Sequence, residues 1–454
     1  MTQLSALIFD GWFLYKVLER DANFESQSSM SSLPQRTEVL IVGAGPAGLA
    51  AALSLHRQGC TDIVIVDSNL AGENTSRALL IHAATLEARH KVSGIKLWDG
   101  EHFHTEMADF GVLVGHTKFP FILIVPQNVT EQVLYQRVKE EGIIVHRPAR
   151  VIGINSNNNN SGLTDVIFEG GGIIQTRHLI GADGAQSIIR QCVGTRYADP
   201  DGETLSEEGI AFAVIADITF SIPPSLGKRE MFYVANGNLL VLVPVPSLTS
   251  EGAEVWRIIS GVRTGAPPHA PPKEYLQALL DQYGPGVVPA SVLPDNTPLT
   301  IEKVIWSTRF RTHSAISDRC FTRLSGDNTG AVVLVGDAAH LHPPVGGQGM
   351  NLGLRDAISL GPALARHIVN SQQADTADVD LEKWADERHA QALKVIARAK
   401  SMLAWAGAKN VPSVYYGVVP VNWFKVRNFI LWAGSVTGFL KANLPWQLSG
   451  LLNP

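Results

Sequence analysis

The sequence predicts an α/β fold with a Rossmann-like domain, a second domain on a mixed, mostly antiparallel β-sheet, and helices at the C-terminal end. Three observations support this prediction. Short apolar runs end directly in glycine clusters, strand-like segments alternate in polarity between residues 205 and 312, and long helical patterns follow residue 351. With 454 residues, the chain is long enough to bury the cores of two domains.

Composition narrows the function before any motif is considered. The chain is 45% hydrophobic and 17% charged, its formal net charge is −5, and it has no basic cluster of the kind that binds nucleic acid. Its three cysteines, Cys60, Cys192 and Cys320, are too few and too widely spaced for a disulfide framework or a metal cluster. We therefore expect a cytoplasmic protein that binds no nucleic acid.

Apolar stretches near the two ends of the chain bear on membrane association. Residues 1–36 form an extension in which Asp10 interrupts the apolar patch Leu4–Tyr15, and no positive residue precedes that patch, so it is a poor match to a secretory signal. We expect an amphipathic helix and a linker there, and peripheral membrane association is the alternative. Phe429–Leu440 is too short to span a bilayer, so it predicts a buried helix and no integral membrane span.

The first folded unit has a β-α-β pattern. Glu38–Val42 and Ile63–Asp67 are apolar runs typical of buried parallel strands, and Ala47–Gln58 between them is rich in Ala and Leu, as helices are. The turn that joins the first strand to the helix has the sequence GAGPAG over residues 43–48.

Each glycine of this turn has its own use. Gly43 permits the sharp turn, Gly45 lets the backbone approach a pyrophosphate, and Gly48 lets the helix pack closely on the strand. The N-terminus of the helix faces the phosphates with its partial positive charge. Asp67 ends the second strand and is placed to accept hydrogen bonds from ribose hydroxyls. The turn therefore predicts a dinucleotide site, and the alternative is a tight turn that binds nothing.

A second glycine motif covers residues 181–187. It follows a helix predicted at Thr130–Glu140 and strands predicted at Gly142–His146 and Ile173–Ile180. Asp183 and Gly184 are its candidates for contact with a cofactor. The alternative is that Asp183 only caps the short helix that follows.

The region between residues 205 and 312 has the alternating polarity of strands, with one helix predicted at Pro272–Tyr283. Beyond it, helices are predicted at Asn351–His367 and Leu381–Ala406. The strands expected in the alternating region are Ile210–Thr219, Glu230–Val234, Leu239–Val243 and Val255–Val262.

A third motif, residues 336–351, follows the apolar strand predicted at Thr329–Val335. Asp337 at the end of that strand can accept hydrogen bonds from a sugar-like chain, and two prolines stop the chain from becoming helical at once. Three glycines then bring bare amides to a helix N-terminus, which suits a group that gains negative charge, such as the N1–C2=O edge of a reduced flavin. The alternatives are a plain glycine loop, or a metal site at His340 and His342, for which no third ligand is nearby.

The three motifs together resemble the class A flavoprotein monooxygenases, the superfamily of p-hydroxybenzoate, phenol and pentachlorophenol hydroxylases. The sequence from Gly336 to Asn351 is most similar to the phenol-hydroxylase-like branch of fungal type, and Phe310–Ser314 and Trp446–Leu451 add to the resemblance. It covers residues 37 to 451.

The resemblance implies a discontinuous FAD-binding domain of the GR2 type, with NADPH or NADH as transient reductant and O2 as co-substrate. The implied reaction is hydroxylation of an aromatic, phenol-like small molecule by a flavin C4a-hydroperoxide, in secondary metabolism. The cofactor-binding residues that carry over are Gly43, Gly45, Ala47, Gly48, Asp67, Arg77, Gln127, Asp183, Gly184, Gly336, Asp337, Gly349, Met350 and Asn351.

The residues expected near the reacting atoms are fewer. Pro344 and Gly347 are expected to position the flavin face, and Phe212, Phe232 and Leu242 to line the substrate cavity, with core packing as the alternative. Two other functions stay open: epoxidation or Baeyer–Villiger-type insertion on a non-phenolic substrate, and a flavin-binding protein with lost turnover. A homodimer is a further expectation.

The sequence also departs from the family pattern. We expect a helical segment to be shortened after Glu87, the first 36 residues to be additional, and the thioredoxin-like C-terminal domain of some phenol hydroxylases to be lacking. The predicted domain division is an extension at 1–36, an FAD-binding domain at 37–91, 127–204 and 313–400, a substrate domain at 92–126 and 205–312, and a C-terminal helical region at 401–454.

Overall fold

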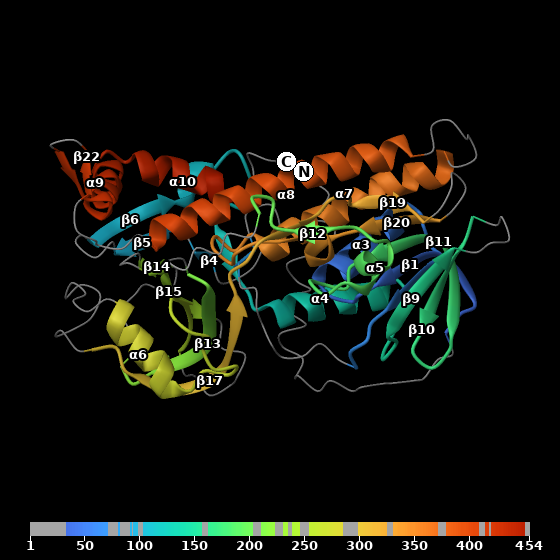
Figure 1. Ribbon diagram of the computed structural model, residues 1–454, viewed down its shortest axis with the longest axis horizontal. Coiled ribbons are helices and arrows are strands. Elements are labelled where there is room, and N and C mark those ends of the chain that lie inside the picture. Colours follow the sequence, from blue (N-terminus) through green and yellow to red (C-terminus); the bar gives the residue numbers. More distant parts are fainter. Residues whose placement is uncertain are drawn as a thin grey trace.

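Two large β-sheets, surrounded by helices, form the frame of the molecule (Figure 1). The predicted α/β class is confirmed. Arg77, the segment after Glu87 and the N-terminal extension up to residue 32 lie outside the described residues. The computed structural model describes residues 33–70, 80–81, 91–92, 94–98, 103–156, 162–202, 210–222, 230–234, 238–245, 254–284, 298–324, 330–370, 378–407, 414–416 and 419–449.

The first sheet has eight strands and a parallel centre in the order β20-β11-β1-β2-β8. Strand β19 pairs antiparallel with β20 at one edge, and β10 and β9 continue from β11 as an antiparallel meander. The strands are β1 (Arg36–Val42), β2 (Ile63–Val66), β8 (Ile144–His146), β9 (Val151–Ser156), β10 (Thr164–Phe168), β11 (Ile173–Gly181), β19 (Phe321–Arg323) and β20 (Ala331–Leu334).

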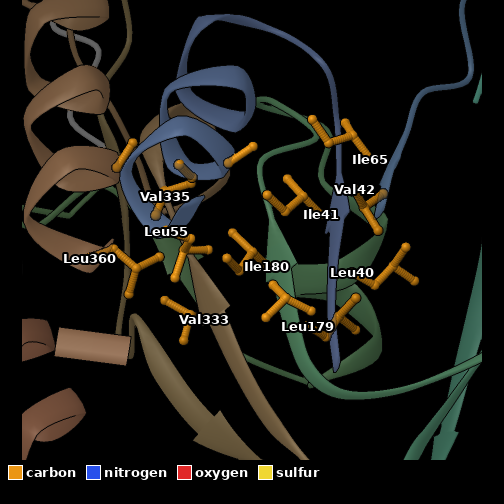
Figure 2. Packing of buried hydrophobic residues seen from close by; sticks show 14 of the residues in the cluster. Leu40, Ile41, Val42, Leu55, Ile65, Leu179, Ile180, Val333, Val335 and Leu360 are labelled. Carbon is orange, nitrogen blue, oxygen red and sulfur yellow. The ribbon is translucent and has the colours of Figure 1, made fainter. Parts of the chain in front are cut away.

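Helices α3 (Pro46–Arg57) and α7 (Gly349–Asn370) pack together over this sheet. Figure 2 shows Leu55 of α3 and Leu360 of α7 beside Ile180 and Val333 of the sheet. Strands buried on both faces need continuous apolar runs, which explains the buried runs at residues 39–42 in β1, 179–180 in β11 and 331–334 in β20. Helix α4 (Gln127–Glu140) adds Leu134 to the same core.

The second sheet has seven strands in the order β17-β13-β16-β15-β14-β5-β6 and is antiparallel except between β14 and β5. Helix α6 (Lys273–Tyr283) covers one face and buries Leu276 there. The strands are β5 (Gly94–Trp98), β6 (Phe103–Asp109), β13 (Phe212–Phe220), β14 (Glu230–Val234), β15 (Leu240–Val245), β16 (Val255–Val262) and β17 (Ile301–Arg311). The mostly antiparallel second sheet is therefore confirmed, whereas the domain boundaries stay a prediction.

Short elements connect the two sheets. Helix α5 (Ile188–Cys192) follows β11, and 3-10 turns lie at Phe110–Leu113 and Gly336–Ala338. The small sheets contain β3 (Leu80–Ile81), β4 (Lys91–Val92) and β7 (Ile122–Ile124); β12 (Tyr197–Ala198), β18 (Ala315–Ser317) and β21 (His340–Leu341); and β22 (Val414–Tyr416) and β23 (Val419–Val421).

Helix α8 (Val379–Ala406) links the two halves of the molecule (Figure 1). Its first turns bury Leu381 and Trp384 in the core of the parallel sheet. Its last turns place Met402 and Ala406 in a cluster with residues of the second sheet. Because one continuous helix contributes to both cores, the relative position of the two sheets is fixed by its packing at each end.

Two further helices, α9 (Trp423–Val436) and α10 (Phe439–Ser449), lie at one end of the molecule (Figure 1). The prediction of one buried helix at Phe429–Leu440 is wrong. Gly438 has φ +72° and separates the two helices. Phe429 is 63% exposed and Val436 is 68% exposed, because α9 packs mainly through Phe424, Arg427 and Asn428. Among the described helices, none combines the length and apolarity needed to cross a membrane.

Candidate active site

The first glycine turn, between β1 and α3, is held by close backbone contacts. Gly43 has φ +106°, and a Cβ there would lie 2.3 Å from the carbonyl oxygen of Ala182. A Cβ on Gly48 would lie 1.9 Å from the carbonyl oxygen of Gly43. A Cβ on Gly45 would meet no atom within 4 Å. The fold itself therefore requires glycine at 43 and 48, whereas Gly45 leaves open space in front of the helix.

Asp67, just beyond β2, supports this turn. One carboxylate oxygen, Oδ2, accepts a hydrogen bond of 2.7 Å from the amide of Ala44, and Oδ1 accepts one of 2.8 Å from the amide of Asn69. Arg147 donates to the carbonyl oxygen of Ala44 at 3.0 Å from the other side. A carboxylate oxygen has two lone pairs and can still accept from a sugar hydroxyl. The ribose role of Asp67 stays a prediction.

In the second glycine motif, Asp183 stabilises the start of α5. Its Oδ2 accepts hydrogen bonds from the amides of Ile188 and Ile189 at the start of α5, at 2.7 and 3.3 Å. Burial of the carboxyl raises the pKa of Asp183, although these hydrogen bonds oppose the rise. Gly184 has φ +80° and lines the main cavity. The structure thus gives Asp183 the capping role that was the alternative, and its contact with a cofactor stays a prediction.

In the third motif, the turn after β20 lies directly against α3. Gly336 has φ +60°, and a Cβ there would be 3.1 Å from the Cβ of Ala47 and 3.7 Å from the Cα of Gly353. The backbone oxygen of Asp337 accepts a hydrogen bond of 3.1 Å from the hydroxyl of Tyr197. Three segments that are distant in sequence therefore meet at one edge of the parallel sheet.

The loop from Pro344 to Gly349 leads into α7 and is held by two side-chain hydrogen bonds near that helix. The side-chain amide of Asn351 donates to the carbonyl oxygen of Gly347 at 2.8 Å. The side-chain amide of Gln348 donates to the carbonyl oxygen of Leu448 in α10 at 3.0 Å. The C-terminal helices thus hold this loop in place, and sequence spacing gave no sign of this contact.

Gln127 begins α4 and faces the same space. Its side-chain amide donates to Oε1 of Glu131 at 2.7 Å. Burial raises the pKa of the Glu131 carboxyl, although the hydrogen bond from Gln127 opposes the rise. Both side chains line the cavity. Glu131 was missed in the sequence because a lone carboxylate on an amphipathic helix is normally a solvated residue.

Two buried histidines follow Asp337. The Nε2 atom of His340 lies 2.6 Å from Oδ2 of Asp356, and both side chains are buried. Burial disfavours the charged ring, but the Asp356 carboxylate outweighs it and raises the pKa of His340. Among the described residues, no group of three or more His, Cys, Asp or Glu side chains could hold a metal ion.

His342 has the opposite character. Its Nδ1 lies 2.8 Å from the carbonyl oxygen of Pro343, and a carbonyl only accepts, so Nδ1 carries the proton of the neutral ring. Burial lowers the pKa of His342 to about 4, so the ring is neutral at pH 7. Its Nε2 is then an acceptor, and it has no hydrogen-bond partner among the described residues. The side chain lines the cavity beside Gly349.

One cavity of about 890 Å³ connects these pieces. Its wall at the parallel sheet includes Gly45, Ala47, Gly184, Gly336 and Asp337. The same cavity continues past the loop after β21, where the predicted residues Pro344, Gly347, Gly349 and Met350 line it. It ends against the second sheet, so the predicted cofactor and substrate regions share one space.

Two of the three predicted substrate residues lie on the face of that sheet that is turned away from the cavity. Leu242 is fully buried in the core under α6, and Phe212 packs against the same core. Successive side chains of a strand point to opposite faces, so the neighbours of Leu242, Val241 and Val243, line the cavity instead. The predictions for Phe212 and Leu242 are therefore wrong. The side chain of Phe232 lies outside the described part of the structure.

A model of the FAD binding domain family matches residues 36–399 of this chain. The chain belongs to the FAD binding domain family. Pentachlorophenol 4-monooxygenase of Sphingobium chlorophenolicum is 29% identical over 348 residues, which cover 72% of this chain and 58% of that protein. Rifampicin monooxygenase of Rhodococcus hoagii is 29% identical over 360 residues, which cover 73% of this chain and 64% of that protein. The chain thus spans less than two thirds of the length of these relatives.

Solved structures show the same fold. The anhydrotetracycline hydroxylase from Streptomyces rimosus superposes with a TM-score of 0.63 at 23% identity, over 92% of this chain and 76% of that one. The p-nitrophenol 4-monooxygenase from Pseudomonas putida superposes with a TM-score of 0.67 at 18% identity, over 92% of this chain and 99% of that one. At these low identities, the superpositions show that the chain shares the fold of these structures.

The cavity fits the group that gives the family its name. Gly45 leaves space where a side chain would block a pyrophosphate, and α3 begins there with its positive dipole end. Asp337 and Gly349, at the start of α7, line the same cavity. The wall therefore offers a group suited to each part of FAD: the turn at Gly45 would suit the pyrophosphate, Asp337 the ribityl chain and the start of α7 the ring.

The resemblance and spacing missed the contribution of the C-terminal part of the chain. Residues of α8, α9 and α10 line the cavity together with those of the two sheets, including Met402, Ile430, Leu431, Leu440 and Leu444. The apolar composition of this region is visible in the sequence, but composition alone does not show which helices meet a cavity.

Proposed function

We propose that this chain is an FAD-dependent monooxygenase that uses NADPH or NADH and O2 to hydroxylate an aromatic, phenol-like small molecule. The observation that carries the proposal is the single cavity of about 890 Å³ that joins the dinucleotide turn to the apolar face of the second sheet. A volume of this size lies in the range of enclosed ligand sites. The names of relatives that act on pentachlorophenol and rifampicin support an aromatic substrate.

FAD, when bound, supplies the redox chemistry: it takes a hydride from the nicotinamide and passes one atom of O2 to the substrate while the other leaves as water. The protein therefore needs no nucleophile or metal of its own. Its tasks are to hold the cofactor, orient the ring of the substrate and exclude water.

Water is excluded by the wall that the second sheet supplies. Ile215, Val241, Val243 and Ile259 present an aliphatic surface to the cavity. An apolar wall of this kind suits the face of an aromatic ring, and its low polarity strengthens the few polar interactions present. We propose that the aromatic substrate stacks between this wall and the loop at Pro344 and Gly347.

The start of α7 is suited to hold the pyrimidine edge of the flavin. The first amides of a helix have no partner inside the helix and carry partial positive charge. The glycines before Met350 keep side chains away from these amides, and the bond from Asn351 to Gly347 fixes their direction. Negative charge that develops on a ring placed there is stabilised by the helix end.

His342 is the wall residue that we propose to orient the substrate hydroxyl. Its fixed Nδ1 proton leaves Nε2 as an acceptor, and that atom lacks a partner among the described residues. A ring whose pKa is about 4 is too weak a base to remove a phenol proton outright. Its role is to accept a hydrogen bond and to orient the ring, which makes His342 a positioning residue.

The test begins with the visible spectrum of the purified protein. We expect bound flavin, bleaching on addition of NADPH, and recovery in air that a phenolic additive accelerates. Turnover under ¹⁸O-labelled O2 then places one labelled atom in the product. A phenolic product supports hydroxylation, whereas an epoxide or a lactone identifies the alternative oxygen-insertion reactions. Protein that takes up no FAD refutes the proposal, and bound flavin that no nicotinamide reduces identifies the form with lost turnover.

A further inference from the structure

One end of the molecule carries an unusual group of exposed aromatic side chains. Among the described residues, every exposed large aromatic side chain lies at the end of α8, in α9 or at the start of α10. These residues are Trp405, Trp423, Phe429, Trp432 and Phe439. Ile430 and Val436 of α9 are exposed beside them, at 48% and 68%. We call these seven residues the aromatic cap. Isolated exposed apolar residues are normal, but a contiguous group marks an interaction surface.

The charged side chains of α9 and α10 themselves have one sign. Helices α9 and α10 contain no Asp or Glu, and Lys425 is exposed on α9 while Lys441 is partly exposed on α10. The sequence holds no acidic residue from position 388 to its end, although the formal net charge of the whole chain is −5. Asp109 of β6 lies 3.9 Å from Lys441, and such an exposed, loose pair contributes little. The exposed sides of α9 and α10 are therefore apolar with added positive charge.

The aromatic cap is also continuous with the wall of the cavity. Ile430 is half exposed and yet lines the cavity, together with Leu431, Leu440 and Leu444 from the same two helices. Trp405 is likewise both exposed and part of the wall. Between α9 and α10 lies a second hollow, lined by Gly434 and Phe439 among others. Among the described residues, α9 and α10 thus contribute side chains both to the inner cavity and to the outer apolar surface.

We propose that the aromatic cap docks on an anionic phospholipid surface and that aromatic substrates enter the cavity from the membrane between α9 and α10. Helices with Trp and Phe on one side and Lys nearby lie in the plane of a membrane interface, with the apolar side below the headgroups. Trp is enriched at that depth. The absence of Asp and Glu from α9 and α10 favours docking, because an anionic lipid surface repels carboxylates and attracts lysines. Entry of substrate rests on the proposed function, whereas docking does not.

The test measures docking without catalysis. The full chain, loaded with FAD, is sedimented with phosphatidylcholine vesicles that contain or lack phosphatidylserine, at low and high salt. We expect binding to the anionic vesicles that salt weakens. The double substitution Phe429→Ser and Trp432→Ser is expected to lower that binding by about tenfold or more, because two aromatic side chains leave the lipid. Lys425→Gln is expected to lower it about fivefold on anionic vesicles only.

A matched control changes two exposed apolar residues elsewhere. Val369 at the end of α7 and Ile305 on β17 are 74% and 52% exposed, and their replacement by Ser is expected to leave binding unchanged. Retained flavin absorbance shows that each variant is folded. Absence of wild-type binding overturns the proposal, as does equal binding of the two double variants. A change from dimer to monomer by light scattering in the Phe429 and Trp432 variant, without any vesicle binding, assigns the surface to a second copy of the chain instead.

Discussion

The two ends of the cavity are built on different principles. At the parallel sheet, the wall is mostly backbone: Gly43 and Gly48 are required by contacts of 2.3 and 1.9 Å, and Gly336 lies directly against Ala47. At the second sheet, the wall is made of aliphatic side chains from alternate positions of the strands. The first kind of wall leaves a motif in the sequence because few residue types satisfy it. The second kind tolerates many apolar residues and leaves only a pattern.

The largest effect is expected at the first glycine turn. Gly43→Ala places a Cβ 2.3 Å from a backbone oxygen at φ +106°, and we expect it to destabilise the protein by about 4 kcal/mol or more. Gly45→Ala is the matched control for the fold, since its Cβ meets no atom within 4 Å, and its stability should change by less than about 1 kcal/mol. Flavin affinity of the Gly45 variant should still fall about tenfold or more. Denaturant unfolding and flavin titration measure both effects in the two variants. Equal stability of the two variants would contradict the structural requirement for glycine at position 43.

In the second sheet, two neighbouring residues of β15 point to opposite faces, so their replacement should affect stability and substrate binding differently. Leu242→Ala is expected to cost about 3 kcal/mol, because it opens a void in the core under α6. Its KM for the aromatic substrate should not change. Val241→Ala enlarges the cavity instead, and is expected to cost about 1 kcal/mol or less while it changes KM. Unfolding curves of the two variants measure the loss of stability, and steady-state kinetics measure the change of KM. A change of KM in the Leu242 variant alone would show that the faces are assigned wrongly.

An intermediate effect is expected from pH at His342. The folded pKa, about 4, lies below the ordinary value of 6.5, so the unfolded chain binds more protons between these two values. Stability is therefore lost as the pH falls, and this ring contributes a loss of about 1.5 kcal/mol between pH 6.5 and pH 5. His342→Phe should remove that part of the pH dependence. Unfolding of both proteins at the two pH values provides the measurement, and parallel losses in wild type and variant would contradict it.

The smallest effect concerns the thiols, all three of which belong to the parallel-sheet half. Burial raises the pKa of all three thiols, that of Cys60 to about 11 and that of Cys320 to about 12, but Cys192 on α5 is the exposed one. We expect one thiol to react rapidly with Ellman's reagent in the native protein. Cys320 should react only when β19 and β20 separate, so its labelling reports the opening of this half alone. Rapid reaction of Cys320 in native protein would show that the parallel sheet is the less stable half.

The difference between a backbone wall and a side-chain wall also explains which parts of the structure the sequence predicts. The β-α-β unit, the strand before Gly336 and the helix α7 are predicted closely, because period and glycine placement reflect backbone geometry. Phe212 and Leu242 were assigned to the wrong face, because alternation shows that a strand has two faces without showing which one meets the cavity. The contact between Gln348 and Leu448 joins positions 100 residues apart, and no local pattern encodes it.

The exposure of the aromatic residues of α9 could not be predicted from the sequence. An apolar run predicts burial because most such runs are buried. The run Phe429–Leu440 fails this expectation because Gly438 divides it and only one side of α9 packs on the protein. Amphipathicity was present, but the side that packs is the one with Arg427 and Asn428 rather than the one richest in aromatic residues.

The bond between the hydroxyl of Ser54 in α3 and the carbonyl oxygen of Ile358 in α7 joins residues 304 positions apart. Ribosomes add about 5 to 20 residues per second, so α3 waits about 15 to 60 seconds for its partner helix during synthesis. Throughout that interval the alanine- and leucine-rich side of α3 stays uncovered in the growing chain. The yield of folded protein should therefore depend on chaperones that bind nascent apolar segments. Slower release of the chain from these chaperones should lower the yield less than removal of the chaperones.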